Sequence, residues 1–173
     1  MNKIKKDKSK DAFEKYLSDG NADYKIQNFT TSDVNNIDGV LTANYTITHS
    51  NAVSSFGKEY YVDLDFKKEM NGGTLDSTRK LDYVFPYKTH IERITELVIP
   101  AGYIVTSMPQ NLSINTKDYD FEISYSHNNE KIIYHKSIII KNTLISKNKF
   151  KQWNDDVNKL TEAYNQQLVL TAQ

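Results

Sequence analysis

The chain has 173 residues, of which 38% are hydrophobic and 12% aromatic, and its 22 basic side chains balance 22 acidic ones. This composition is too apolar for a disordered chain and too polar for a membrane protein. A neutral chain also lacks the overall field that attracts nucleic acid. Because cysteine is absent, disulfides, thiolate metal sites and every kind of cysteine enzyme are excluded.

The N-terminal segment carries a basic run of five lysines between residues 3 and 10. No apolar stretch of roughly 7–15 residues follows it, so the run does not open a signal peptide. Phe13, Tyr16 and Leu17 then fall at helical spacing, which predicts a short helix over residues 8–17. The chain is then expected to be either cytosolic or a fragment cut from a longer exported protein.

From residue 24 the hydrophobic period changes from helical to alternating. Residues 24–29 and 40–49 are predicted strands, the second with a clear alternation between its two faces. Residues 61–66 alternate as well, and the pattern predicts that Val62, Leu64 and Phe66 point inward.

The second half keeps the strand pattern up to residue 141. Strands are predicted over residues 91–99, 103–105 and 112–114. A hairpin follows, with one strand around Phe121–Tyr125, a loop at 127–130 and a return strand over 131–141. These two hairpin strands carry the strongest strand signal in the chain.

After residue 146 the period returns to that of a helix. Apolar side chains spaced three and four apart predict one longer amphipathic helix: Phe150, Trp153, Val157, Leu160 and Tyr164. A last strand is predicted over residues 166–172. The fold class is therefore mainly β, an antiparallel β-sandwich-like architecture with a short N-terminal and a longer C-terminal helix. We expect one β-rich domain over 1–173, with a division into subdomains 1–75 and 76–173 as the alternative.

Few residues form a pattern that suggests chemistry. His127 and His135 face each other in the predicted hairpin, but no histidine spacing is typical of a metal site, so we expect solvated histidines, no metal and no cofactor. Asp63 and Asp65 share one strand face about 7 Å apart, as paired-carboxylate hydrolases require and as any solvent-facing strand also provides. No catalytic residue is predicted.

Aromatic side chains offer the other candidate site. Four tyrosines could provide stacking faces for a sugar or peptide: Tyr60, Tyr61, Tyr83 and Tyr87. Trp153 lies on the apolar stripe of its helix, where core packing is the expected role.

The last 95 or so residues carry a pattern that resembles a known family. Arg79 precedes a Val-Phe-Pro-Tyr stretch at 84–87, and a strand with Glu92 leads into Ile-Pro-Ala-Gly-Tyr at 99–103. Next come Pro109, the Phe121 hairpin and the helix with Phe150 and Trp153. The pattern ends with Leu-Val-Leu at 168–170. The pattern resembles the C-terminal domain of exported Bacteroidetes proteins, which follows a transglutaminase-like protease domain. In that family the Cys-His-Asp centre belongs to the preceding domain, so the resemblance implies no catalytic residue here.

Three functions are open at this point. The first is a non-catalytic accessory domain, periplasmic or at the cell surface, that contacts the transglutaminase-like domain of its parent protein through an exposed apolar patch. The second is a carbohydrate- or peptide-binding module that uses the four tyrosines. The third is a hydrolase, which requires a histidine beside a serine or an acid in a cleft. Neither nucleic acid nor membrane insertion is expected.

Overall fold

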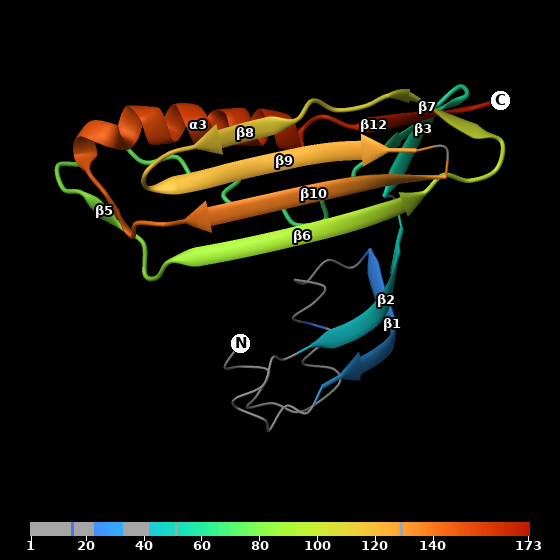
Figure 1. Cartoon of the computed structure of the whole chain (residues 1–173), viewed down its shortest axis with the longest axis horizontal. Coiled ribbons are helices and arrows are strands. Elements are labelled where there is room, and N and C mark those ends of the chain that lie inside the picture. Colours follow the sequence, from blue (N-terminus) through green and yellow to red (C-terminus); the bar gives the residue numbers. More distant parts are fainter. Residues whose placement is uncertain (1–14, 16–22, 33–41, 51, 129) are drawn as a thin grey trace. The chain divides into compact units, whose positions relative to one another are not determined.

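The structure, a computed structural model, describes residues 15, 23–32, 42–50, 52–128 and 130–173. The chain divides into two compact units, residues 1–52 and residues 53–173. The strands and the one long C-terminal helix confirm the predicted, mostly antiparallel β class (Figure 1). No helix in the described part of the chain is both long and apolar enough to cross a membrane.

The first unit contains an antiparallel pair of strands, β1 (Tyr24–Thr31) and β2 (Ala43–His49). Their register is interrupted between Gln27 and Thr30, where Asn28 has a φ of 53°. Asparagine tolerates this left-handed conformation better than most residues, which explains the irregularity. The strands predicted in this region are confirmed where the structure describes them. The helix predicted over 8–17 lies outside the described residues apart from Lys15, which is helical.

The second unit is built on a four-stranded antiparallel sheet, called the long sheet below. Its strands lie in the order β6 (Thr89–Val98), β10 (Lys131–Ile140), β9 (Tyr119–His127) and β8 (Leu112–Asn115). The predicted hairpin is confirmed as β9 and β10. In β10 every second residue is buried, because alternate side chains of a strand point to opposite faces.

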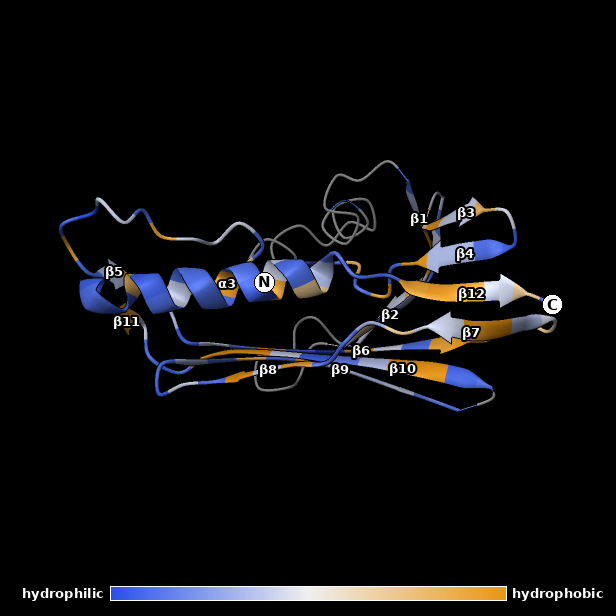
Figure 2. Cartoon of the chain, turned by 90° about the horizontal axis from the view of Figure 1, so that it is seen from above, coloured by the Kyte–Doolittle hydropathy of each residue, from blue (hydrophilic) through white to orange (hydrophobic). Residues whose placement is uncertain are grey.

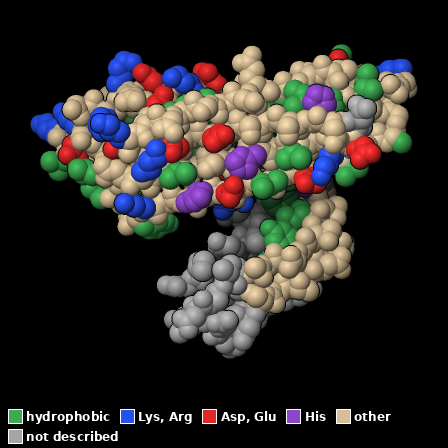
Figure 3. Space-filling view, in the orientation of Figure 1, with side chains coloured by type: hydrophobic (Ala, Val, Ile, Leu, Met, Phe, Trp, Pro, Cys, Tyr) green, Lys and Arg blue, Asp and Glu red, His purple; other side chains and the backbone are tan. Residues whose placement is uncertain are grey.

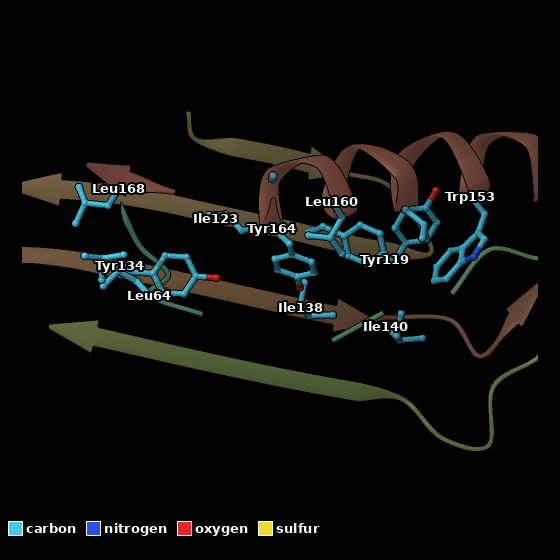
Figure 4. Packing of buried hydrophobic residues seen from close by; sticks show 14 of the residues in the cluster. Leu64, Tyr119, Ile123, Tyr134, Ile138, Ile140, Trp153, Leu160, Tyr164 and Leu168 are labelled. Atoms are coloured by element: carbon cyan, nitrogen blue, oxygen red, sulfur yellow. The ribbon is translucent and has the colours of Figure 1, made fainter. Parts of the chain in front are cut away.

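Helix α3 (Phe150–Tyr164) follows a short 3₁₀ turn (Lys147–Lys149) and covers one face of the long sheet (Figure 2). All five residues of the predicted apolar stripe are buried. Figure 4 shows Trp153, Leu160 and Tyr164 pointing from the helix toward the sheet. The indole Nε1 of Trp153 also donates to the carbonyl of Gly73 over 2.8 Å, so the segment before β5 is fixed to the helix.

A second four-stranded sheet, the short sheet, joins distant parts of this unit. Its order is β3 (Val53–Phe56), β4 (Glu59–Val62), β12 (Leu168–Ala172) and β7 (Tyr103–Ser107). The strand predicted near the C-terminus is thus confirmed as β12, between β4 and β7. A two-stranded sheet of β5 (Tyr83–Val84) and β11 (Leu144–Ile145) lies beside the end of α3 that is farther from the short sheet (Figure 2).

The prediction for residues 61–66 is wrong in its last part. Val62 and Leu64 are buried, but Phe66 is 54% exposed. Strand β4 ends at Val62, and the next residues turn because the carboxylate of Asp63 accepts from the backbone N–H of Asp65 over 2.9 Å. Such side-chain to backbone hydrogen bonds compete with strand pairing. The turn directs Asp65 into the core and leaves Phe66 outside.

Candidate functional site

An exposed apolar patch lies on the two-stranded sheet. Val84 of β5 is the cross-strand partner of Leu144 of β11, and these side chains are 61% and 42% exposed. Leu81 and Tyr87 flank β5 and are 74% and 69% exposed. We call these four residues the β5–β11 patch. Figure 3 shows hydrophobic side chains gathered at this end of the second unit.

The backbone under the β5–β11 patch is firmly held. The strand neighbours of the exposed pair, Tyr83 and Ile145, point inward, and Ile145 is completely buried. Phe85 N–H donates to the carbonyl of Thr143 over 2.8 Å, next to the strand pair. The patch is therefore an apolar surface on a packed support and not a frayed core.

Basic residues lie next to the β5–β11 patch in the sequence, and one of them, Arg79, contacts its strand β5. Arg79 donates through Nε to the carbonyl of Leu81 over 3.1 Å, and its guanidinium lies 5.6 Å from the ring centre of Tyr83. Lys80 and Lys88 stand at either side of β5 in the sequence, and Lys147 is tied to this segment by its backbone N–H, which donates to Asp82 over 2.8 Å. The patch thus has the apolar centre and polar rim that are common at protein contact surfaces.

A group of charges lies on the inner face of the long sheet. Lys136 of β10 is completely buried, and its Nζ donates to both carboxylate oxygens of Asp65 over 2.7 Å, to Glu69 over 2.6 Å and to the carbonyl of Lys67 over 2.6 Å. Arg93 of β6 donates to the other carboxylate oxygen of Glu69 through two nitrogens, over 2.8 and 2.5 Å. Two cations and two carboxylates therefore compensate one another, and we call this group the Lys136 cluster.

Two tyrosines complete the Lys136 cluster. Tyr134 donates its hydroxyl to Asp65 and Tyr164 donates to the carbonyl of Glu69, each over 3.0 Å. Burial raises the pKa of both hydroxyls, and the nearby carboxylates raise it further, so both stay protonated as donors. Burial also acts to raise the pKa of Glu69, but hydrogen bonds from Arg93 and Lys136 outweigh it and hold that pKa below its ordinary value.

The arrangement of the Lys136 cluster is that of a structural core element. A catalytic lysine needs a neutral amine that faces a substrate. Here Nζ is enclosed by oxygen acceptors from Asp65, Lys67 and Glu69, and the ring of Tyr164 lies 5.1 Å away. The cluster joins β10 and β6 to the segment before β5 and to α3. This group was not predicted from the sequence, although Lys136 lies in the inward phase of a strand whose other inward members are Ile and Tyr.

The predicted pair of carboxylates does not form a site. Asp65 is buried in the Lys136 cluster, whereas Asp63 pairs with Lys68 over 2.8 Å. Because β4 ends before either residue, the expected common strand face does not exist. Neither group is placed as a free acid or base.

The predicted pairing of His127 with His135 is wrong. The hairpin register places His127 opposite Ile132 and His135 opposite Ser124. His135 instead lies with its Nε2 3.0 Å from the carboxylate of Glu92, on the solvent side of the long sheet. Within the described ranges, no group of three or more potential ligands could hold a metal ion.

A polar hollow of about 480 Å³ lies where the β8–β9 turn meets the start of α3. Asp118 at its wall accepts from Lys149 and Asn142, and the hydrogen bond from Lys149 is the main reason that the pKa of Asp118 is lowered. The carbonyl of Asp118 also accepts from the backbone N–H groups of Lys141 and Asn142. These contacts hold the β8–β9 turn in place and occupy the carboxylate of Asp118 with structural hydrogen bonds.

The four candidate tyrosines lie in two separate places. Tyr60 and Tyr61 are successive in β4, so they point to opposite faces of the short sheet. Tyr60 packs edge-on against the ring of Tyr103, and the hydroxyl of Tyr61 donates to the carboxylate of Glu59 over 2.5 Å. Tyr83 points inward, and Tyr87 belongs to the β5–β11 patch. Strands β4 and β5 lie near opposite ends of the second unit (Figure 2), so the four rings do not form one stacking surface.

Comparison with known proteins gives a family match. Residues 59–170 match the model of the family DUF3858, described as "Domain of Unknown Function with solved-structure structure". The matched residues make up more than half of the chain. Among curated proteins, none matches. A crystal structure described as that of a "putative protease" from Parabacteroides distasonis is similar over 60% of this chain, with 14% sequence identity and a TM-score of 0.49. The similar part spans 20% of that protein's length.

Proposed function

The chain belongs to the DUF3858 family, and from this premise we propose that it is a non-catalytic accessory domain that contacts a neighbouring domain of its parent protein. The neighbour is the transglutaminase-like domain suggested by the resemblance of the last 95 or so residues to exported Bacteroidetes proteins. The parent protein would then act in the periplasm or at the cell surface.

The observation that carries this proposal is the β5–β11 patch. Val84 and Leu144 lie side by side on strands whose opposite faces are packed into the core, so their exposure costs hydrophobic stabilisation in the isolated chain. Complete burial of a side chain of this kind contributes about 1.5–3 kcal/mol. A docking domain would recover this contribution, and Tyr87 adds an aromatic side chain of a type enriched in interfaces.

The polar groups support the non-catalytic part of the proposal. Lys136, Asp65 and Glu69 are buried and their charges neutralise one another together with the partly exposed Arg93, while His135 lies beside Glu92 on the outer face of the sheet. A general base must reach a substrate proton while it is free to accept it. Neither group is arranged in that way.

Amide hydrogen exchange tests the proposal. It compares the 173-residue chain with the full-length product of the reading frame that contains it. We expect the amides of residues 81–85, 87 and 143–145 to exchange at least tenfold more slowly in the full-length protein, because the docked domain covers them. The double substitution Val84→Lys with Leu144→Lys should remove this difference.

A matched control is available on the short sheet. Phe56 and Ile104 are also exposed apolar residues, at 79% and 45%, and lie in one cross-strand row. Substituting both by lysine should leave the protection of the β5–β11 patch unchanged. A reading frame without a transglutaminase-like domain, or equal exchange in both proteins, would refute the proposal. Peptide hydrolysis by the 173-residue chain that is lost on substitution of His135 would refute its non-catalytic part.

A further inference from the structure

Strand β6 forms a long edge of the long sheet. It pairs with β10 over ten residues, from Thr89 opposite Ile140 to Val98 opposite Lys131, without any shift in register. In the part of the chain that the structure describes, β10 is the strand that pairs with β6, and β6 stands at the end of the sheet order. Within the described residues, no second strand pairs with the other side of its backbone.

The hydrogen-bonding direction of β6 follows from the residue just after it. Ile99 N–H donates to the carbonyl of Glu130 over 2.8 Å, in continuation of the β6–β10 pairing. Because N–H and C=O groups alternate in direction along an antiparallel strand, odd-numbered residues of β6 face β10. The backbone groups of Glu92, Ile94 and Glu96 therefore point to the free edge.

A groove lies beside the middle of this edge. It has a volume of about 280 Å³ and is bordered by residues 65–67 on one side and residues 92–95 on the other. Two exposed apolar side chains stand at its walls, Ile94 at 64% and Phe66 at 54%. Free backbone groups next to a recess for a side chain are the two features by which a sheet edge receives an extended peptide.

The β6 edge lacks three of the features that usually prevent strand addition: a proline, a bulge and a short length. Proteins also protect edges by charged side chains, lysine above all, and the charged residues of β6 are Glu92, Arg93 and Glu96. Residues 89–98 contain neither proline nor lysine, and their register is regular. By contrast, β8 and β3 have four residues each, and β7 has a register shift against β12.

We propose that the free edge of β6 receives an extended segment of the neighbouring polypeptide of the parent protein, which adds a strand to the long sheet. This inference rests on the proposed function and specifies one way in which the neighbour is held. The added strand would bear an apolar residue opposite Ile94 and basic residues two positions away on both sides. These basic residues would face Glu92 and Glu96, whose side chains are 58% and 52% exposed.

The charge pattern favours a different polypeptide over a second copy of this chain. In a symmetric pair of two β6 strands centred on Ile94, Glu92 of each copy would lie opposite Glu96 of the other. Like charges directly opposite each other destabilise a strand pair. Glu92 and Glu96 already contact His135 and Lys131 on the β10 side, and a carboxylate has lone pairs for a second donor from the other side.

The test uses amide exchange in the full-length protein and in the 173-residue chain, read at residue level. We expect the amides of Glu92, Ile94 and Glu96 to exchange at least tenfold more slowly in the full-length protein. The variant Ile94→Pro removes an outward N–H without breaking a hydrogen bond to β10, and it should abolish the protection of Glu92 and Glu96. The control Ile94→Thr keeps the N–H and should retain most of the protection of Glu92 and Glu96.

The outcomes separate this inference from the proposed function. Protection at the β5–β11 patch with fast exchange at Glu92, Ile94 and Glu96 overturns the β6 inference and leaves the proposed function intact. Protection at the β6 edge with an unprotected patch supports the inference and removes the patch as the contact. Edge protection in the 173-residue chain that increases with its concentration means pairing of two copies, which overturns the inference. A full-length protein whose exchange matches that of the chain at both places overturns both.

Discussion

His135 and Lys136 are neighbours in β10, and each contacts acidic side chains, but they do so on opposite faces of the long sheet. Lys136 is completely buried between Asp65 and Glu69, whereas the side chains of His135 and Glu92 are 30% and 58% exposed. A buried charge must be compensated inside the fold, while an exposed pair is already solvated. The inner face therefore holds the fold together, whereas the pair on the outer face is solvated.

The largest difference between the two faces should appear when Lys136 is replaced. Lys136→Met removes the ammonium but keeps most of the side-chain volume, and it leaves Asp65 and Glu69 with excess buried negative charge. We expect a loss of about 3–5 kcal/mol in the free energy of unfolding, measured by urea denaturation. Lys131→Met on the same strand breaks an exposed pair with Glu96 and should cost about 1 kcal/mol or less. Equal losses in the two variants would contradict the structural role of the Lys136 cluster.

Strand β11 offers the same comparison with apolar residues. Ile145 is completely buried and Leu144 is 42% exposed, although they are adjacent. We expect Ile145→Ala to cost about 2–5 kcal/mol, because it leaves a cavity in the core. Leu144→Ala should change stability by about 0.5 kcal/mol or less in the 173-residue chain. A large loss for Leu144→Ala in thermal or urea unfolding would mean that the β5–β11 patch belongs to the core and not to a contact surface.

The Lys136 cluster should also make stability depend on acid pH. The pKa of Glu69 is lowered in the folded protein, so its contribution is present above its ordinary value of 4.5. That contribution is lost as the pH falls from this value through the lower folded pKa. Stability should therefore decrease below about pH 4.5, and Glu69→Gln should flatten this part of the curve. Urea unfolding at several pH values measures both curves, and an unchanged slope in the variant would contradict the assignment.

Much of the fold could be predicted from the sequence because its signals are local. The alternation in residues 131–141 and the helical spacing from Phe150 to Tyr164 identify β10 and α3, and both agree with the structure. The strands that were not predicted, β3, β5 and β11, have only two to four residues, too few for a period to appear. Strand β12 was predicted, but its partners β4 and β7 are set by packing over long distances in the chain.

The candidate surfaces were harder to predict than the fold. Phe66 was expected inside because it continues an alternating pattern, and only the Asp63 hydrogen bond shows where the strand ends. Lys136 gave a usable signal, since a lysine in the inward phase of a strand requires a buried carboxylate. The identity of that carboxylate, 71 residues away in the chain, depends on the tertiary structure. The β6 edge depends on sheet order, which hydrophobic periodicity does not contain.

The smallest effect should come from His135, directly beside the residue with the largest. Replacing His135 by alanine removes its contact with the carboxylate of Glu92 on the open face of the sheet. Since both side chains are partly exposed, we expect a change of about 0.5 kcal/mol or less in the free energy of unfolding. Glu92→Gln keeps the shape of the partner and should change stability by a similarly small amount. If His135→Ala instead costs as much as Lys136→Met in urea unfolding, the outer face is part of the stabilising core, and the distinction between the two faces of the sheet fails.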